Sequence, residues 1–542
     1  MNARRPPLGV VTGGSFNAGL TVRLHHNCPT ESLRVGSFVV LEGDRNLYFS
    51  LIMDMKLCVT DSTLSADPPR TDSAFIRRAL SGTHTYATVE VRPSLMLEEH
   101  EELDGPGPVP VRNIPMHFAS LREADEQDFD LVFGKEDKAR FALGTPPAMP
   151  DLRVPIDLEK LIELSNGVFG QSGTGKSVLT RWLVYGIIKS DVASTLIFDM
   201  HSEYAKAPSG KPGIAGMVEL FGTTRVKVYT LDPATDDNAA TRHLRIGLSQ
   251  IEPADIELLA AELNLTPTFA ATAHQLWLRY KEQWMRRLLA MNGDDVAAFC
   301  DDTGAHRGAV DALRQKLARL SPQAKPYIVD EPDASIIDDM LQHIQRGHHV
   351  ILQFGRYDSL LDYMLVANIV TRRIHQRYTD QVLKSETTGS LAGKPRHLVV
   401  VLEEAHKFLA PDTARQSIFG TIAREMRKYS VTLLVVDQRP SGIDPEVLSQ
   451  LGTKITGRLT DQQDIDAVLT GVSDRNQMRG MLASLDAKQE CLLIGHAVPM
   501  PLMLKTREYD RAELLADLRL GGLGPRDGRR SLALLNGEDD EH

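Results

Sequence analysis

The feature that most constrains this chain is the segment GQSGTGKS at residues 170–177, which matches the phosphate-binding pattern GxxxxGK[ST]. An apolar run at 166–169 precedes it and a helical pattern at 178–189 follows it, which is the context that the pattern requires. Glycines let the backbone curl so that successive N–H groups point at phosphate oxygens, and the start of a helix adds its positive end. The segment therefore predicts a strand, a nucleotide-binding loop and a helix. A chance glycine-rich turn is the alternative.

The roles within this predicted loop follow from the chemistry of its residues. Lys176 is expected to reach the β and γ phosphates of a nucleotide. Ser177 is expected to supply its hydroxyl oxygen to Mg²⁺, a hard cation that prefers oxygen ligands. The predicted cofactors are therefore ATP and Mg²⁺. The predicted nucleotide-binding residues are Gly170, Gln171, Ser172, Gly173, Thr174, Gly175, Lys176, Ser177 and Val178.

Downstream of about residue 150, apolar strands alternate with longer helical segments, which is typical of a parallel sheet with crossover helices. Predicted strands that end near Met200, Glu404 and Gln438 each close on polar residues. Because α/β proteins bind ligands at the carboxyl ends of their strands, we expect the chemistry at this edge of the sheet.

Two glutamates at one strand end are the main acidic candidates. A phosphoryl-transfer site needs an acidic group near the metal and a residue that orients the attacking water. Glu403 and Glu404 end the run HLVVVL, and alternation along a strand predicts that their carboxylates point in different directions. We assign Glu403 to the Mg²⁺ shell and Glu404 to the water, against the alternative of a solvated acidic turn. Gln438, at the next strand end, is predicted to bond the γ-phosphate and the water.

Further candidates carry alternatives of their own. Asp199 ends another predicted strand and either lies near the nucleotide or caps the following turn. The segment IAREMRKYS contains Arg424 and Arg427, and Arg427 is our first choice for an arginine that reaches the γ-phosphate from a neighbouring subunit. A favourable interaction with the helix dipole is the alternative for this basic helix end. Arg458, after a later predicted strand, is the second candidate.

The chain of 542 residues is several times longer than a common domain of about 100–150 residues. Its first part reads as short alternating strands separated by turn residues, which predicts a small β-barrel, although a β-sandwich fits the same alternation. The predicted organisation is a barrel at 1–95, a linker and connecting segment at 96–150, a first ATPase part at 151–250, an inserted helical bundle at 251–345, a second ATPase part at 346–515 and a tail at 516–542.

The composition of the chain excludes fewer classes of protein than its motifs do. A formal net charge of −11 disfavours a uniformly nucleic-acid-binding surface. Part of the acidic excess lies at 98–104 and 538–541, so a basic channel elsewhere stays open. Four widely spaced cysteines imply neither a disulfide framework nor a zinc site. No signal peptide or membrane span is evident, and we expect a cytoplasmic protein.

Taken together, these segments resemble the HerA–FtsK superfamily of ring-forming, DNA-pumping ATPases, and its HerA branch most closely. The resemblance covers most of the chain. Residues 9–19 and 35–43 look like the HerA N-terminal HAS barrel. FGQSGTGKS resembles the Walker A motif of the family, LEEAHKFL resembles its Walker B motif, and FDMHSEY resembles its strand with an acidic, His-containing turn. Residues 422–459 resemble its arginine, its sensor and the strand that follows them. The family usually has Asp-Glu where this chain has Glu403 and Glu404, so the chain departs from the pattern at the metal ligand.

The resemblance implies a RecA-like P-loop NTPase core in a homo-hexameric ring, with nucleotide sites between subunits and Arg427 acting in trans. It implies double-stranded DNA in a central channel, for which Lys206, Lys211 and Arg415 are candidate contacts. It also implies a partner that docks on the barrel, either a NurA-like nuclease in DNA end processing or an effector in antiviral defence. The first hypothesis is thus an ATP-driven DNA translocase or helicase that feeds a partner enzyme.

The second hypothesis is an ATP-regulated ring scaffold that assembles and activates a partner effector with little DNA pumping of its own. Stimulation of hydrolysis by DNA separates the two, since a scaffold would respond only slightly. A conjugative or secretion motor is disfavoured because no membrane segment is predicted.

Overall fold

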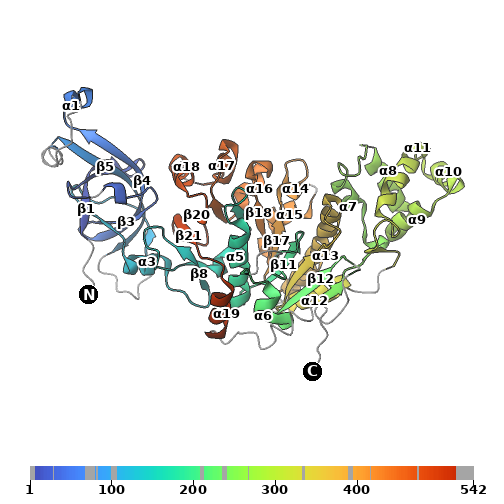
Figure 1. Ribbon diagram of the computed structural model, residues 1–542. Coiled ribbons are helices and arrows are strands. Elements are labelled where there is room, and N and C mark those ends of the chain that lie inside the picture. The colour runs from blue at the N-terminus through green and yellow to red at the C-terminus, as the bar shows by residue number, and fades with distance from the viewer. Residues whose placement is uncertain are drawn as a thin grey trace. The chain divides into compact units, whose positions relative to one another are not determined.

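The computed structural model describes residues 6–28, 30–67, 80, 84–98, 107–207, 213–232, 234, 241–266, 268–331, 336–388, 395–415, 417–472 and 475–520 (Figure 1). The chain divides into two compact units. The first comprises Met1–Leu161, Phe169–Lys176 and Gly452–Arg507, and the second comprises Ile162–Val168, Ser177–Leu451 and Glu508–His542. Among the described residues, no helix has both the length and the apolar character that crossing a bilayer requires.

The first unit begins with a closed six-stranded β-barrel. Its strands follow the order β2-β1-β7-β3-β4-β5, and β5 pairs back with β2, which closes the sheet. The predicted barrel is therefore confirmed, and the sandwich alternative is wrong. Alternating side chains such as Val22, Val39 and Leu121 fill the interior without exposed surface. The strands are β1 (Pro7–Ser15), β2 (Gly19–Leu24), β3 (Phe38–Glu42), β4 (Asn46–Val59), β5 (Thr85–Glu98) and β7 (Ser120–Glu123), with β6 (Val109–Pro110) added beside β5.

Strand β7 comes from the segment 96–150, which the sequence suggested was a linker. It pairs antiparallel with both β1 and β3, so the barrel cannot close without it. Its Arg122 is buried and pairs with Glu42 at 2.8 Å and with Asp128 at 2.6 Å. Asp128 lies on α3 (Glu126–Phe133), so this ion cluster fastens the following helix to the barrel wall.

The rest of the first unit is built on antiparallel strands in the order β19-β20-β21-β8-β9. The register pairs Ile455 with Leu493 and Leu492 with Met503, so apolar side chains face each other along the ladder. The strands are β8 (Arg140–Thr145), β9 (Val154–Asp157), β19 (Thr453–Gly457), β20 (Glu490–Gly495) and β21 (Leu502–Thr506), and the helices α17 (Gln462–Val468) and α18 (Arg475–Ser484) connect β19 to β20.

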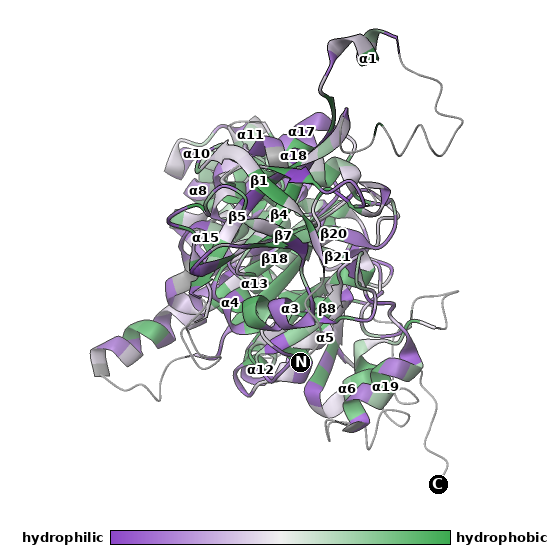
Figure 2. Cartoon of the chain, turned by 90° about the vertical axis from the view of Figure 1, so that its left-hand side faces the viewer, coloured by the Kyte–Doolittle hydropathy of each residue, from purple (hydrophilic) through white to green (hydrophobic). Residues whose placement is uncertain are grey.

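The second unit is the predicted α/β core. Its strands follow the order β13-β12-β16-β11-β17-β18-β10, and the pairs β12–β16, β11–β16, β11–β17 and β17–β18 are all parallel. Figure 2 shows β18 as a hydrophobic strand, as its seven buried residues require. The strands are β10 (Asn166–Phe169), β11 (Ser194–Asp199), β12 (Val226–Thr230), β13 (Thr241–His243), β16 (His349–Gln353), β17 (Leu398–Glu403) and β18 (Val431–Asp437).

Helices cover this sheet, and the largest aromatic side chains lie beneath them. Trp182 on α5 has no exposed surface and packs edge-on against Tyr185 at 5.6 Å between ring centroids. Tyr185 and Lys189 both contact Asp517 of α19, at 2.6 and 2.8 Å, which fixes the end of the described chain to α5. The helices are α4 (Leu158–Glu163), α5 (Lys176–Ser190), α6 (Met217–Arg225), α12 (Ile336–Gln345), α13 (Leu360–Thr388), α14 (His406–Leu409), α15 (Ile418–Glu425), α16 (Pro445–Gln450) and α19 (Arg511–Leu520).

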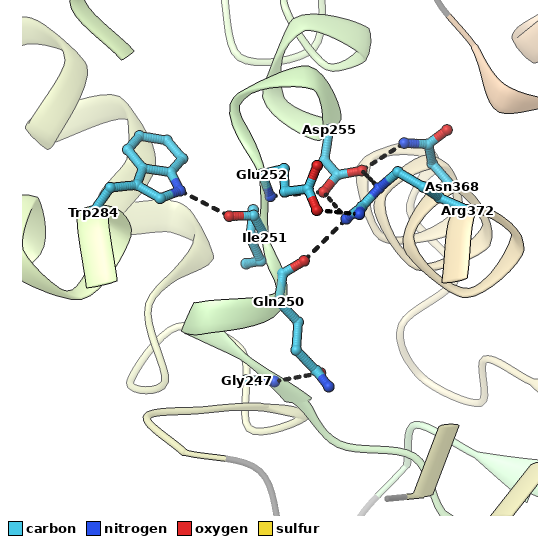
Figure 3. Close-up of polar contacts among 8 residues, drawn as sticks. All are labelled: Gly247, Gln250, Ile251, Glu252, Asp255, Trp284, Asn368 and Arg372. Carbon is cyan, nitrogen blue, oxygen red and sulfur yellow. Dashed lines mark hydrogen bonds and ion pairs between the residues drawn. The ribbon is translucent and has the colours of Figure 1, made fainter. Parts of the chain in front are cut away.

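The predicted helical insertion is present in the second unit. It lies between β14 (Ile246–Gly247) and β15 (Ile328–Val329), which pair in parallel and close its base. Its helices are α7 (Pro253–Leu258), α8 (Phe269–Tyr280), α9 (Trp284–Ala290), α10 (Gly293–Thr303) and α11 (Arg307–Leu317). Buried polar contacts tie α7 to the core helix α13 (Figure 3). Helix α12 lies within the range predicted for the insertion, yet it packs against β11 and β16 of the core sheet.

Candidate nucleotide-binding site

The predicted phosphate-binding loop adopts backbone conformations that glycine favours. Gly170, Gly173 and Gly175 have φ values of +151°, +83° and +95°. A Cβ atom at Gly170 would lie 2.7 Å from Thr174 Oγ1, so a larger residue would crowd the loop. Within the same unit, Thr174 Oγ1 donates to the carbonyl of Gln171 at 2.8 Å. The loop is thus folded by local contacts that its sequence specifies.

Lys176 and the two residues after it connect the loop to α5. The Lys176 Nζ donates to the carbonyl oxygen of Gln171 at 3.0 Å, so the ammonium group lies against the loop itself. Helix α5 begins at Lys176, which puts Ser177 and Val178 in its first turn, and Ser177 is exposed. This arrangement supplies N–H groups of a helix start, a cation and a hydroxyl along three consecutive residues.

In the second unit, three predicted strand ends lie together. Strand β17 pairs in parallel with β11 on one side and with β18 on the other, with Val401 opposite both Ile197 and Leu434. The carboxyl ends of β11, β17 and β18 therefore meet at one edge of the sheet, as the sequence predicted. This edge carries Glu403 and Glu404 together with Gln438.

Glu403 is half-buried at the end of β17. The Tyr204 hydroxyl donates to its Oε1 at 2.7 Å, and the Tyr363 hydroxyl donates to its backbone carbonyl at 3.0 Å. Burial raises the pKa of Glu403 to about 7, although the hydrogen bond from Tyr204 acts in the opposite direction. The neighbouring carboxylate of Asp199 adds to the rise. A bound cation would relieve this cost, so the carboxyl group suits a position beside a metal.

Glu404 has left the strand. Its φ of +49° lies in the left-handed region, so the regular alternation of β17 does not extend to it. The two carboxylates have different partners, since Glu403 accepts from Tyr204. The Gln438 Nε2 donates to Glu404 Oε1 at 3.1 Å, so the residue predicted to orient water and the predicted sensor amide lie in contact.

Asp199 is fully buried and its carboxylate is used by the protein itself. It accepts the backbone N–H of Glu203 at 2.7 Å and that of Tyr204 at 3.0 Å. The Gln353 amide reaches the same carboxylate at 3.5 Å. Burial raises the pKa of Asp199, and these hydrogen bonds lower it. The geometry supports the capping alternative, in which Asp199 shapes the turn that carries Tyr204.

The candidate arginines are not gathered at this edge by any contact among the described residues. Arg424 Nη2 donates to the carbonyl of Ala414 at 3.3 Å. Arg427 lies in the 3-10 helix Met426–Tyr429, and its side chain lies outside the described residues. Arg458 belongs to the first unit, where its carbonyl oxygen accepts the N–H of Gln171 at 3.2 Å. Of the channel candidates, Lys206 and Arg415 are described and Lys211 is not.

Sequence reasoning missed three residues that hold the predicted site together. Tyr204 bonds Glu403, His406 lies beside Glu404, and Asp437 bonds His406. Asp437 directly precedes Gln438, and Tyr204 ends the segment FDMHSEY, so both lie within segments that carry candidate residues. Their contacts join strands far apart in the chain, and for this reason spacing alone gave no signal.

Comparisons with known proteins show which proteins this chain is similar to. The family model described as the central domain of the helicase HerA matches residues 141–374. The DNA double-strand break repair helicase HerA of Pyrococcus furiosus is 23% identical over 446 residues, which cover 78% of each chain. The protein of the same name from Sulfolobus acidocaldarius is 24% identical over 493 residues, 89% of this chain and 90% of that one.

Among solved structures, VirB4 of Thermoanaerobacter pseudethanolicus is 15% identical with a TM-score of 0.46, over 69% of this chain and 98% of that one. The similarity to HerA depends instead on the family model and on relatives that align over most of the chain. The central part of this chain is thus similar to the central domain of HerA, and most of its length is similar to HerA helicases.

Proposed function

We propose that this chain forms a homo-hexameric ring that uses ATP hydrolysis to translocate along and unwind double-stranded DNA. Relatives named as DNA double-strand break repair helicases, which align over most of the chain, support the proposal. The observation that carries it is the contact between Gln438 and Glu404, 3.1 Å apart, at the carboxyl ends of neighbouring parallel strands. A carboxylate and an amide in contact can orient a water molecule for attack on a phosphate. The same chain also carries a phosphate-binding loop.

In this proposal, residues 170–178 bind the triphosphate. The loop directly follows β10 and leads into α5 along the chain. Lys176 would neutralise charge on the β and γ phosphates. The N–H groups of residues 170–175 and the start of α5 would bind the remaining phosphate oxygens.

Mg²⁺ fits the chemistry of two candidate donors. The Ser177 hydroxyl and the Glu403 carboxylate are oxygen ligands of the kind that Mg²⁺ prefers, and a cation beside the buried Glu403 would stabilise its charged form. Bound Mg²⁺ would supply charge neutralisation at the phosphates. Glu403 has one methylene more than the aspartate usual in the family, and the Tyr204 hydroxyl holds the end of this longer side chain.

Glu404 and Gln438 would act on the attacking water. The carboxylate can accept a proton or hydrogen bond from the water, and the amide can bond both the water and the γ-phosphate. The proposal keeps Arg427 as the arginine that acts from a neighbouring subunit, with Arg424 and Arg458 as its alternatives. Asp199 is proposed to shape the turn after β11 rather than to contact nucleotide, because two backbone N–H groups occupy its carboxylate.

The barrel is proposed as the docking surface for a partner, either a NurA-like nuclease or an antiviral effector. Several of its large apolar side chains are exposed, with Leu57 at 88%, Phe118 at 73% and Met116 at 63%. Apolar surface of this kind often marks an interaction site. The same observation favours a second candidate function, in which the ring mainly assembles and regulates a partner enzyme.

ATP hydrolysis by the purified protein, measured with and without linear double-stranded DNA, separates the two functions. The translocase proposal predicts stimulation by DNA and ATP-dependent strand displacement, both lost in Lys176→Ala. Hydrolysis that ignores DNA, together with activation of a co-purified partner, would favour the scaffold. Molar mass in solution tests the ring, since a monomer that hydrolyses ATP at full rate would remove the hexamer from the proposal.

A further inference from the structure

The strand ends beside Glu404 hold a buried carboxylate to which the mechanism above gives no role. Asp437 closes β18, and its side chain has no exposed surface. It accepts three hydrogen bonds: from the His406 backbone N–H at 2.7 Å, from the His406 Nδ1 at 2.9 Å and from the Arg439 backbone N–H at 2.7 Å. Asp437 therefore ties the turn that follows β17 to the end of β18.

His406 stands between this buried carboxylate and Glu404. Its Nδ1 lies 2.9 Å from Asp437 Oδ2 and 3.7 Å from Glu404 Oε2. Side-chain exposure rises from 0% for Asp437 to 20% for His406 and 34% for Glu404. The buried acid thus fixes the imidazole ring, and the ring in turn flanks the acid that reaches solvent.

The side chain of Glu404 is held by flanking contacts rather than by the alternation of a strand. Glu404 follows the last residue of β17 and has left-handed φ, so the alternation of the strand has ended. One of its oxygens accepts a hydrogen bond from Gln438, and the other faces His406. Both flanking residues are anchored at the end of β18. Gln438 directly follows Asp437 in the chain, and His406 is bonded to Asp437.

A role in folding the turn does not account for all of these contacts. The backbone N–H of His406 already bonds Asp437 at the start of α14, and any residue other than proline at position 406 would keep that bond. The imidazole contact is an additional one. It orients a ring toward Glu404, which a purely structural turn does not need.

We propose that His406, held by Asp437, is a positioning residue that sets where Glu404 places the attacking water. The inference rests on the proposed role of Glu404 in hydrolysis. His406 would act through Glu404 and would leave nucleotide binding, which depends on the P-loop, unchanged. Misplacing a reacting group by about 1 Å can cost on the order of 100-fold in rate, so the effect belongs in kcat.

The test compares three substitutions of one residue. In His406→Asn, the side-chain amide can put a donor near the position of Nδ1, whereas in His406→Gln it reaches toward the position of Nε2. We expect His406→Ala and His406→Gln to lower kcat about 10- to 100-fold, and His406→Asn to recover most of the rate. The dissociation constant of a fluorescent ATP analogue in the presence of Mg²⁺ should stay within about twofold of the wild-type value in all three.

Equal losses of kcat in the Asn and Gln variants would overturn the positioning role, as would a loss of affinity that matches the loss of rate. A lowered melting temperature with full kcat would assign His406 to stability alone. Asp437→Asn supplies an independent variant, because the NH2 group of the amide cannot accept a hydrogen bond from the N–H donors that Asp437 now binds. Its kcat should also fall while its affinity for the ATP analogue stays unchanged. The proposed function fails if the wild-type protein shows no ATP hydrolysis that depends on Lys176. If the wild-type protein hydrolyses ATP and the His406 variants do so at the same rate, only the positioning role of His406 is overturned.

Discussion

The attachment of the helical insertion offers the sharpest stability prediction, and Figure 3 shows the residues concerned. Arg372 of α13 donates from Nη2 to Asp255 at 2.8 Å and to the carbonyl of Gln250 at 3.1 Å, and it also contacts Glu252. Asp255 has no exposed surface, and Arg372 is 12% exposed. Replacing Arg372 with alanine would leave a buried carboxylate without its cation.

The size of the effect follows from what remains after each substitution. Removing one partner of a buried ion pair costs about 3–5 kcal/mol. In Arg372→Ala, Asp255 keeps the hydrogen bonds from Asn368 at 2.7 Å and from the Glu252 N–H at 2.8 Å, so we expect the lower part of that range. In Asp255→Ala, Arg372 keeps Glu252 and Gln250, but the buried Asn368 amide and the Glu252 N–H lose their acceptor, so we expect a cost in the same range of about 3–5 kcal/mol. The double variant should cost less than the sum of the two single variants, because both single variants remove the same Arg372–Asp255 pair.

Hydrogen exchange of α7 to α11 measures this locally, which matters because a chain with several domains does not unfold in one step. The matched control is Arg377→Ala on the same helix. Arg377 pairs with Asp338 at 2.9 Å, but both side chains are largely exposed, at 60% and 47%, so its loss should cost below about 1 kcal/mol. If exchange across the insertion accelerates no more in Arg372→Ala than in Arg377→Ala, or if the two single costs simply add, the reasoning from burial is wrong.

Three further predictions concern single side chains. Tyr204→Phe keeps the ring but removes the hydroxyl that bonds Glu403. Loss of about 1 kcal/mol should raise the Mg²⁺ concentration needed for half-maximal nucleotide binding about 3- to 10-fold. An unchanged Mg²⁺ titration would show that Tyr204 has no effect on metal binding. Burial holds the pKa of His349 well below its usual value, so only the unfolded chain takes up this proton and stability should fall by up to about 1.4 kcal/mol per pH unit below pH 6.5; urea unfolding of His349→Gln should show a shallower decline, and an identical slope would contradict the assignment. Arg122→Ala should loosen the barrel by about 3 kcal/mol because Asp128 would stay buried without its cation, and unchanged hydrogen exchange in β7 would refute this.

Local patterns in the sequence were sufficient for much of this fold. The P-loop could be predicted because its glycines, its lysine and the flanking strand and helix lie within about 25 consecutive residues. Strands β11, β17 and β18 could be predicted because fully buried parallel strands are continuous apolar runs. The alternation along the first 95 residues was enough for a barrel or a sandwich, and only pairing of β2 with β5 decided between them.

The missed features depend on contacts between distant residues. Strand β7 has the sequence SLRE, which is too short and polar for periodicity to reveal, and its place is set by pairing with β1 and β3. The left-handed backbone of Glu404 and the bond from His406 to Asp437 arise where two strands end side by side. The sequence placed the acidic candidates at the correct sheet edge, but it could not show which neighbouring side chains hold them.

The central claim is that Glu404 directs hydrolysis of a nucleotide that the P-loop binds. Its most direct test is single-turnover hydrolysis of ATP with Mg²⁺ by Glu404→Gln, measured together with ATP affinity. Losing a general base typically costs about 100- to 10,000-fold, so we expect wild-type affinity with hydrolysis slowed at least about 100-fold. Hydrolysis by Glu404→Gln at the wild-type rate would show that Glu404 does not direct the reaction.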